Sequence, residues 1–191
     1  MLEQIIPSKT RRKILGLFFH SPQESFYLRK IVREVNEEVN AVKRELDILS
    51  AAKVLAKEKR LNKIFFSLNK NWRFYDEFLR IFAKTNQLST LIYDNLSKIG
   101  KLKYAALSMK YVKKISIKSD EVYLLFVGTV VMPEVQSIIT QAEKGFGQEI
   151  NYTIMTEEEF LFRKKNHDPF IWRFLKQPKI MLVGNEDEFI K

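Results

Sequence analysis

The sequence contains no cysteine, only two histidines, and no apolar run long enough to cross a membrane. Without cysteine there can be no disulfide, no thiolate metal site and no cysteine nucleophile. His20 and His167 are far apart in sequence, which argues against a histidine metal site and leaves only carboxylates as metal ligands. The N-terminus reaches Lys9, Arg11 and Arg12 early and lacks the apolar core of a signal peptide. We therefore expect a cytoplasmic protein with no membrane contact and no cofactor.

The composition is that of a globular protein with an excess of basic residues. Hydrophobic residues make up 46% of the chain and aromatic residues 13%, which is enough to bury a core. The formal net charge is +10, and residues 1–86 carry 18 Lys and Arg against 10 Asp and Glu, whereas residues 87–191 carry 15 against 13. A basic excess confined to one region indicates a polyanionic partner; a solvated lysine-rich surface is the plainer alternative.

The first third of the chain has the apolar spacing of three consecutive helices. The first runs from Ser8 to a stop at Ser21 and Pro22, and the second covers 28–35. The third begins after a polar break at 36–38. Its predicted buried stripe consists of Val39, Val42, Leu46 and Leu49. Two helices joined by only a few residues are typical of a helix-turn-helix.

A β-hairpin with a basic tip is predicted directly after the third helix. Segments 54–59 and 63–68 are separated by a short turn at 60–62, and the returning segment is rich in β-forming residues. The string VNAVKRELDILSAAKVLAKEKRLNKIFFSLNKN resembles the third helix and wing of ArsR/MarR-like transcription regulators. Such regulators often have a glycine before the first wing strand, where this chain has Ala-Ala-Lys at 51–53. The resemblance implies a winged helix-turn-helix domain over residues 1–70.

The exposed side of the third helix and the hairpin carry the candidate residues for binding double-stranded DNA. A helix fits the major groove, where Lys and Arg read guanine and Asn pairs with adenine, and basic hairpin residues suit phosphates or the minor groove. Glu37, Glu38 and Asp47 are expected to point away from the phosphates. The predicted contacts, led by Arg44, are Asn40, Lys43, Arg44, Lys57, Lys59, Arg60, Lys63, Arg11 and Arg12. For each of them the alternative is a solvated side chain.

Residues 71–99 are predicted to form a helical connector. Two periodic apolar sets, over 72–82 and 88–99, indicate two helices or one bent helix before Gly100. An added helix of this kind often supports a two-fold dimer that matches two DNA half-sites, so we expect a homodimer. The alternative is that these residues pack only onto their own domain.

From residue 100 onward, strands alternate with helices, which predicts a small α/β domain over 100–191 and an α+β chain overall. A helix beginning at Pro133 is expected to end near residue 146, and Thr156 is expected to cap the start of another. The expected strands lie at 104–108, 122–127, 151–155 and 180–184.

The run VYLLFVG and the segment EINYTIMTEEEFLFRKKNHDPFIWRFLKQPKIMLVGNEDEF resemble the C-terminal domain of minimal nucleotidyltransferase-like proteins fused behind a winged helix. Active members carry a Gly-Ser pair and then Asp-x-Asp, whose carboxylates hold magnesium. Here the Gly-Ser pair is missing, Glu121 falls on the first acid, and Tyr123 falls on the second, where a phenol cannot replace a carboxylate at neutral pH. The resemblance therefore implies an inactive domain, with no catalytic or metal-binding residues, that serves dimerisation, effector sensing or partner docking.

Three functions are compatible with these patterns. The leading one is a dimeric transcriptional regulator that binds double-stranded DNA. The second is a nucleotidyltransferase with an unconventional acid set of Asp120, Glu121 and Glu149, although adjacent acids on a strand point to opposite faces. The third is an antitoxin-like module whose C-terminal domain binds a protein partner or a small effector. Salt-sensitive duplex binding, transfer of a labelled nucleotide and co-purification distinguish the three.

Overall fold

The computed structural model describes residues 2–147 and 149–191, and the chain divides into two compact units, Met1–Ala83 and Lys84–Lys191. Each unit combines helices with one small sheet, which confirms the expected α+β class. The boundary falls inside the predicted connector of residues 71–99, which is therefore shared between the units instead of forming a segment of its own. The basic excess follows this division, because the first unit has 17 Lys and Arg against 10 Asp and Glu, and the second has 16 against 13.

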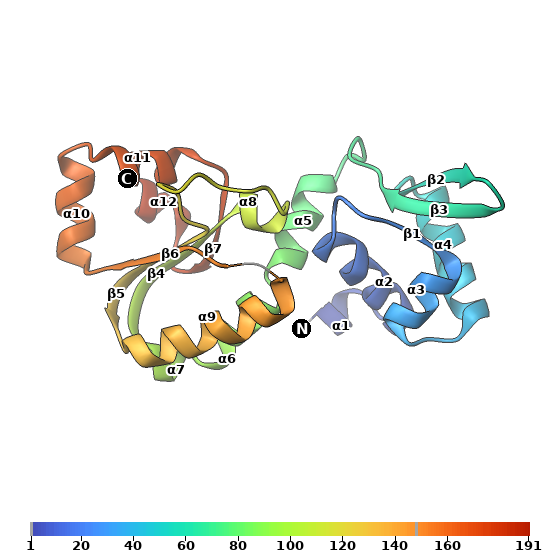
Figure 1. The fold of residues 1–191 in the computed structure, drawn as a ribbon, viewed down its shortest axis with the longest axis horizontal. Coiled ribbons are helices and arrows are strands. Elements are labelled where there is room, and N and C mark those ends of the chain that lie inside the picture. The colour runs from blue at the N-terminus through green and yellow to red at the C-terminus, as the bar shows by residue number, and fades with distance from the viewer. Residues whose placement is uncertain (1, 148) are drawn as a thin grey trace. The chain divides into compact units, whose positions relative to one another are not determined.

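The first unit packs helices against a three-stranded antiparallel sheet (Figure 1). The strand order is β1-β3-β2, so the strand that returns from the hairpin lies in the middle. Its elements are α1 (Leu2–Ile5), α2 (Lys9–His20), β1 (Ser25–Tyr27), α3 (Leu28–Val35), α4 (Val39–Ala51), β2 (Leu55–Arg60), β3 (Lys63–Leu68) and α5 (Tyr75–Ala83). The three helices and the hairpin predicted from the sequence are present as α2, α3, α4 and β2–β3.

An aromatic cluster explains why α5 belongs to the first unit. The ring of Phe19 on α2 stacks on that of Phe82 on α5, with centroids 5.2 Å apart, and Phe78 contacts both rings. Elsewhere on α2, Phe18 packs edge-on against Phe26 of β1 at 5.3 Å. Truncating a fully buried phenylalanine to alanine typically costs about 3–5 kcal/mol, so α2 holds both the sheet and α5 to one core.

α4 ends in a left-handed turn that a lysine occupies. Lys53 has a φ of 60°, and its N–H donates to the carbonyl of Ser50 at 3.0 Å, while the N–H of Val54 donates to that of Leu49, also at 3.0 Å. These two bonds form a Schellman motif, in which glycine is the usual left-handed residue because it has no Cβ. The chain thus makes a turn suited to glycine with Ala-Ala-Lys at 51–53.

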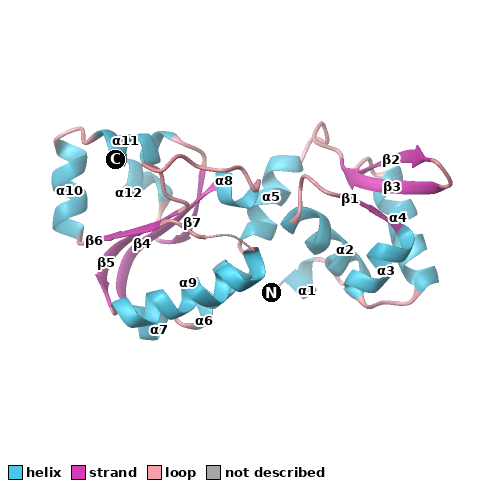
Figure 2. Ribbon diagram, in the orientation of Figure 1, coloured by secondary structure: helices cyan, strands magenta, loops and turns pink. Residues whose placement is uncertain are grey.

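The second unit has a mixed four-stranded sheet with helices on both faces (Figure 2). The strand order is β6-β5-β4-β7; β5 and β6 are parallel and joined by a helix, and the other neighbours are antiparallel. Its elements are α6 (Gln87–Asp94), α7 (Leu96–Ile99), β4 (Gly100–Ser108), α8 (Met109–Val112), β5 (Leu124–Val130), α9 (Met132–Phe146), β6 (Tyr152–Met155), α10 (Glu157–Lys165), α11 (Pro169–Lys176), β7 (Lys179–Val183) and α12 (Glu186–Ile190). The four predicted strands and the two predicted helices are all present, and Thr156 caps α10 by accepting the N–H of Glu159.

The strand predicted to end before Gly128 continues through it to Val130. Gly128 has a φ of 143°, and a Cβ placed there would lie 2.3 Å from the carbonyl oxygen of Lys101 on β4. The register between β4 and β5 shifts next to this point, between Leu102 and Tyr104. Glycine therefore permits a close backbone approach at a bulge here, and does not end the strand.

Within the described residues, no helix is both long and apolar enough to cross a membrane.

The strained turn at the end of α4 predicts that Lys53→Gly stabilises the first unit. A non-glycine residue in the left-handed region costs about 1–2 kcal/mol, and the entropy of glycine in the unfolded chain offsets part of the gain, so we expect about 0.5–1 kcal/mol. Urea unfolding followed by the fluorescence of Trp72, in a Trp172→Phe background, records the first unit alone. Lys53→Ala is the control; it removes the same charge but keeps a Cβ, so an equal gain in both variants would contradict a conformational cause.

Candidate nucleic-acid interface

The turn between α3 and α4 is held by its own polar residues. Asn36 ends α3 in the left-handed region, with a φ of 48° and a ψ of 59°, and asparagine tolerates this conformation better than most residues. Glu38 caps the start of α4, where its carboxylate accepts the N–H of Ala41 at 3.0 Å. Backbone hydrogen bonds from Asn40 and Ala41 lower the pKa of Glu38 below its ordinary value. A polar break of three residues thus caps one helix and starts the next.

Lys13 on α2 ties the same turn to the body of the unit. Its Nζ donates to the carbonyl of Val35 at 2.8 Å and lies 2.7 Å from the carboxylate of Glu37. The close ammonium of Lys13 lowers the pKa of Glu37 and outweighs the opposing effect of desolvation. Glu37 therefore points inward, as expected from the sequence, and the orientation of α4 relative to α3 is fixed by charge as well as by apolar packing.

Glu45 makes the second polar link between α2 and α4. Although it is charged, Glu45 is only 8% exposed, because its carboxylate accepts the Ser8 hydroxyl and the Arg11 Nε, both at 2.7 Å. Desolvation by burial raises the pKa of Glu45, but the hydrogen bonds from Ser8 and Arg11 and the nearby positive charges outweigh it, so the net shift is downward. We call this group of three residues the Glu45 clamp.

The clamp gives Arg11, one of the predicted contacts to the DNA backbone, a partner within the fold. Arg11 is half-buried and directed at α4, where it neutralises Glu45. Arg12 is also engaged within the unit: its Nη1 donates to the carbonyls of Ile6 and Pro7, at 2.6 and 2.9 Å. Glu45 follows Val42 by three residues and precedes Leu49 by four, so it shares their buried face, but an apolar pattern does not predict the burial of a charged side chain.

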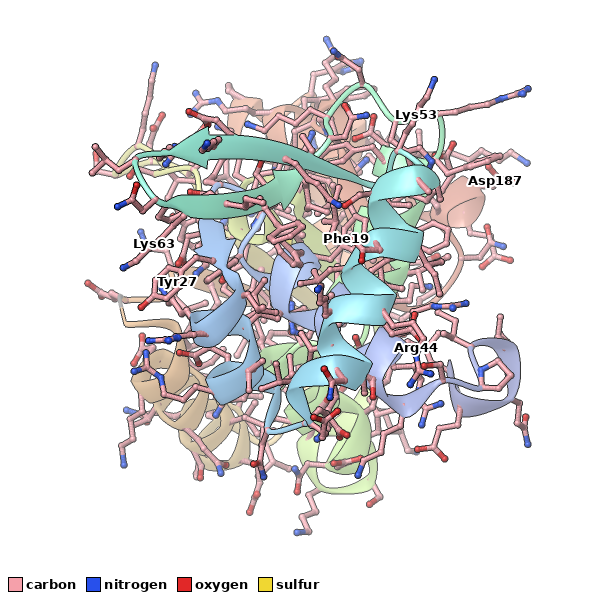
Figure 3. The ribbon with its side chains drawn as sticks, turned by 90° about the vertical axis from the view of Figure 1, so that its right-hand side faces the viewer. Phe19, Tyr27, Arg44, Lys53, Lys63 and Asp187 are labelled. Atoms are coloured by element: carbon pink, nitrogen blue, oxygen red, sulfur yellow. The ribbon has the colours of Figure 1, made fainter. Side chains whose placement is uncertain are left out.

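The opposite side of α4 is exposed and carries the predicted polar residues. Asn40, Lys43 and Arg44 are all exposed, and Figure 3 shows Arg44 projecting from α4. Val39 is 47% exposed, so its assignment to the buried stripe is wrong; Glu45 is buried in addition to the three other apolar residues of that stripe. The helix therefore presents an amide and two cations side by side, at positions that are neighbours on a helical surface.

Asp47 does not point away from these cations. It follows Lys43 and Arg44 by four and three residues, so it shares their exposed face, and its carboxylate accepts a hydrogen bond from Lys57 of the hairpin at 2.8 Å. The hydrogen bond from Lys57 lowers the pKa of Asp47. The expectation for Asp47 is thus wrong, and the ion pair shows that the exposed face of α4 continues directly into β2.

The two faces of the hairpin divide the remaining predicted residues. Lys57 pairs with Phe66, which is buried against the helices, and Lys59 points to the same side because side chains alternate along a strand. The helix-and-hairpin surface therefore comprises Asn40, Lys43, Arg44, Asp47, Lys57 and Lys59.

Arg60 and Lys63 lie on the other face of the hairpin, against two aromatic rings. The guanidinium carbon of Arg60 lies 5.0 Å from the centre of the Phe65 ring, and the Nζ of Lys63 lies 4.6 Å from that of Tyr27 on β1. Figure 3 shows Lys63 and Tyr27 together below the hairpin. Arg60 also donates to the exposed carboxylate of Glu58 at 2.7 Å. Cation–π contacts of this kind hold the two cations in place.

Two of the three candidate acids of the second unit are engaged by cations. Asp120 forms an ion pair with Arg173, and both carboxylate oxygens of Glu121 accept from Lys110 Nζ at 2.7 Å. Hydrogen bonds from these cations lower the pKa of each acid. Glu149 shares one open depression with Glu121, but within the described residues no group of three acids or histidines has a geometry that would hold a metal ion.

Tyr123 is the residue on which the expected nucleotidyltransferase-like pattern would need its second acid. Its side chain is buried, its hydroxyl donates to the carbonyl of Ile115 at 3.1 Å, and its ring packs edge-on against Tyr111. Burial raises the pKa of Tyr111 far above its ordinary value. These tyrosines therefore belong to the core of the second unit.

Comparison of the chain with protein-family models, with curated proteins and with solved structures found no match.

The Glu45 clamp predicts a stability difference that depends on pH. A folded-state pKa below the ordinary 4.5 means that the clamp stabilises the protein above that pH and loses its effect as the pH falls through the folded value. Glu45→Gln should therefore lower the free energy of unfolding by about 1 kcal/mol at neutral pH, discounted for the partial exposure of Arg11, and the deficit should shrink as the pH falls below 4.5 and through the lower folded-state pKa.

Glu58→Gln is the matched control for this measurement, because Glu58 pairs with Arg60 on an exposed hairpin. We expect Glu58→Gln to leave the free energy of unfolding nearly unchanged at both neutral and acidic pH. A deficit in Glu45→Gln that persists undiminished in acid would show that packing, and not charge, accounts for the effect.

Proposed function

We propose that the first unit is a winged helix-turn-helix that binds double-stranded DNA, and that the protein is a transcriptional regulator. The observation that carries this proposal is the helix-and-hairpin surface, where an exposed helix face with Asn40, Lys43 and Arg44 continues into a cationic hairpin. In this reading α3 and α4 form the helix-turn-helix, α4 is the recognition helix, and β2–β3 is the wing.

The chemistry of α4 suits a major groove. An α-helix fits this groove, and an exposed arginine can donate two hydrogen bonds to guanine, while an exposed asparagine can pair with adenine through both its donor and its acceptor. Arg44 and Asn40 are four residues apart and therefore share one face of α4. Lys43, Lys57 and Lys59 supply positive charge for the adjacent phosphates.

We propose that the second unit serves dimerisation or effector sensing and does not catalyse nucleotidyl transfer. Its two acids nearest the expected metal position are paired with Arg173 and Lys110, and a buried tyrosine fills the place of another acid. We propose a homodimer, because two copies related by a two-fold axis present two recognition helices to a symmetric operator. A protein partner or a small effector at the second unit remains compatible with this arrangement.

Charge reversal of Arg44 together with Lys59 tests the proposal. The double variant Arg44→Glu, Lys59→Glu should lose duplex binding, measured by fluorescence anisotropy at low salt, because cations facing phosphates become repulsive. The matched control is Lys101→Glu, Lys144→Glu, which makes the same charge change at exposed positions of the second unit. Equal affinities for the two double variants, or a wild-type protein that does not bind duplexes, would contradict the proposed function.

Asp47 provides a prediction of opposite sign. Removing its charge with Asp47→Asn frees Lys57 and takes a negative charge off the proposed interface, so duplex affinity should rise about twofold to tenfold at low salt. Asp187→Asn, an equal charge change at an exposed residue of the second unit, should change affinity little. Weaker binding by Asp47→Asn would mean that the Asp47–Lys57 pair positions the hairpin and does not oppose the phosphates.

A further inference from the structure

The tip of the hairpin carries an apolar side chain in an unusual setting. Leu61 is 94% exposed and has a φ of 50°, a backbone region that costs a leucine free energy and that glycine or asparagine occupies more readily. Arg60 and Lys63 pair directly across the hairpin, so the turn consists only of Leu61 and Asn62. Neither burial nor backbone preference accounts for a leucine at this position.

Cations stand on both faces of the hairpin next to this leucine. Lys59 points to the side of the helix-and-hairpin surface, whereas Arg60 and Lys63 lie on the other face. The minor groove of DNA is about 6 Å wide and has a phosphate backbone along each wall. A hairpin with positive charge on both faces is complementary to those two walls, and its tip then points at the floor of the groove.

The hairpin is long enough and firm enough to make this contact. The five residues of β2 after Leu55 are all exposed, and at about 3.3 Å per residue they extend about 16 Å, more than the groove depth of about 7.5 Å. The tip is braced from β1, because Lys63 lies over the Tyr27 ring, that ring packs edge-on against Phe65 at 5.7 Å, and Arg60 lies over Phe65. A braced tip presents Leu61 in a defined position.

We infer that Leu61 is a wedge that enters the minor groove of duplex DNA and partly unstacks a base step, with Arg60, Lys63 and Lys59 on the flanking phosphates. This inference rests on the proposed function and adds a deformation of the DNA to it. Apolar side chains between base steps bend a duplex, and flexible pyrimidine–purine steps such as TA unstack at the least cost. The wedge therefore favours DNA sites that have an easily unstacked base step under the hairpin, at positions that α4 does not contact.

The test measures binding and unstacking separately on a short alternating A·T duplex that contains 2-aminopurine, whose fluorescence rises when it is unstacked. At saturation, judged by anisotropy, the wild-type protein should raise the 2-aminopurine fluorescence. Leu61→Asn should still bind the duplex, because asparagine suits the left-handed turn and every cation remains, but the fluorescence rise should be lost. Leu61→Met keeps an apolar side chain and should retain the rise.

The two proposals fail in different ways. Saturable wild-type binding without a fluorescence rise, or an equal rise with Leu61→Asn, would overturn the wedge and leave the proposed DNA-binding function intact. Absence of any duplex binding by the wild-type protein would overturn both. Unfolding measured by circular dichroism checks that each variant is folded, and because Leu61 has no buried contacts to lose, both variants are expected to fold as the wild type does.

Discussion

The candidate interface depends on how α4 is rotated about its axis, and a buried charge sets that rotation. Glu45 is directed inward by Ser8 and Arg11, so the residues on the opposite side of the helix face solvent. The burial of Val42, Leu46 and Leu49 favours the same rotation of α4. A buried carboxylate tolerates fewer positions than an apolar side chain, because its desolvation must be balanced by specific donors.

Three turns around α4 place the rest of the surface, and each uses a left-handed residue other than glycine. Asn36 precedes the helix, Lys53 follows it, and Leu61 lies at the tip of the hairpin. The first two give the chain sharp changes of direction on either side of α4, and after the second turn Lys57 of β2 pairs with Asp47 of α4. Non-glycine residues in this region store strain, and such strain is often found at functional positions.

In the second unit, the polar side chains that were candidates for chemistry instead make contacts that stabilise the fold. Asp120 and Glu121 are adjacent but turn toward Arg173 and Lys110 respectively, and Tyr123 enters the core. Each of these side chains has a partner that accounts for its position. The alternation of strands and helices expected from the sequence is therefore present in the second unit, whereas these three side chains do not form a set of converging acids.

Apolar periodicity by itself determined α2, α3, α4 and the β2–β3 hairpin, the strands β4 to β7 with α9 and α10, and the exposure of Asn40, Lys43 and Arg44, because local spacing dictates which face of an element is buried. It did not predict α1, β1, α8, α11 or α12. Only the tertiary structure decided which charged side chains form ion pairs within the fold. Arg11 meets Glu45, Asp47 meets Lys57, and α5 joins α2, through contacts between residues distant in sequence. A pairing over such distances leaves no periodic signal, since it depends on three-dimensional proximity and on the desolvation of both partners.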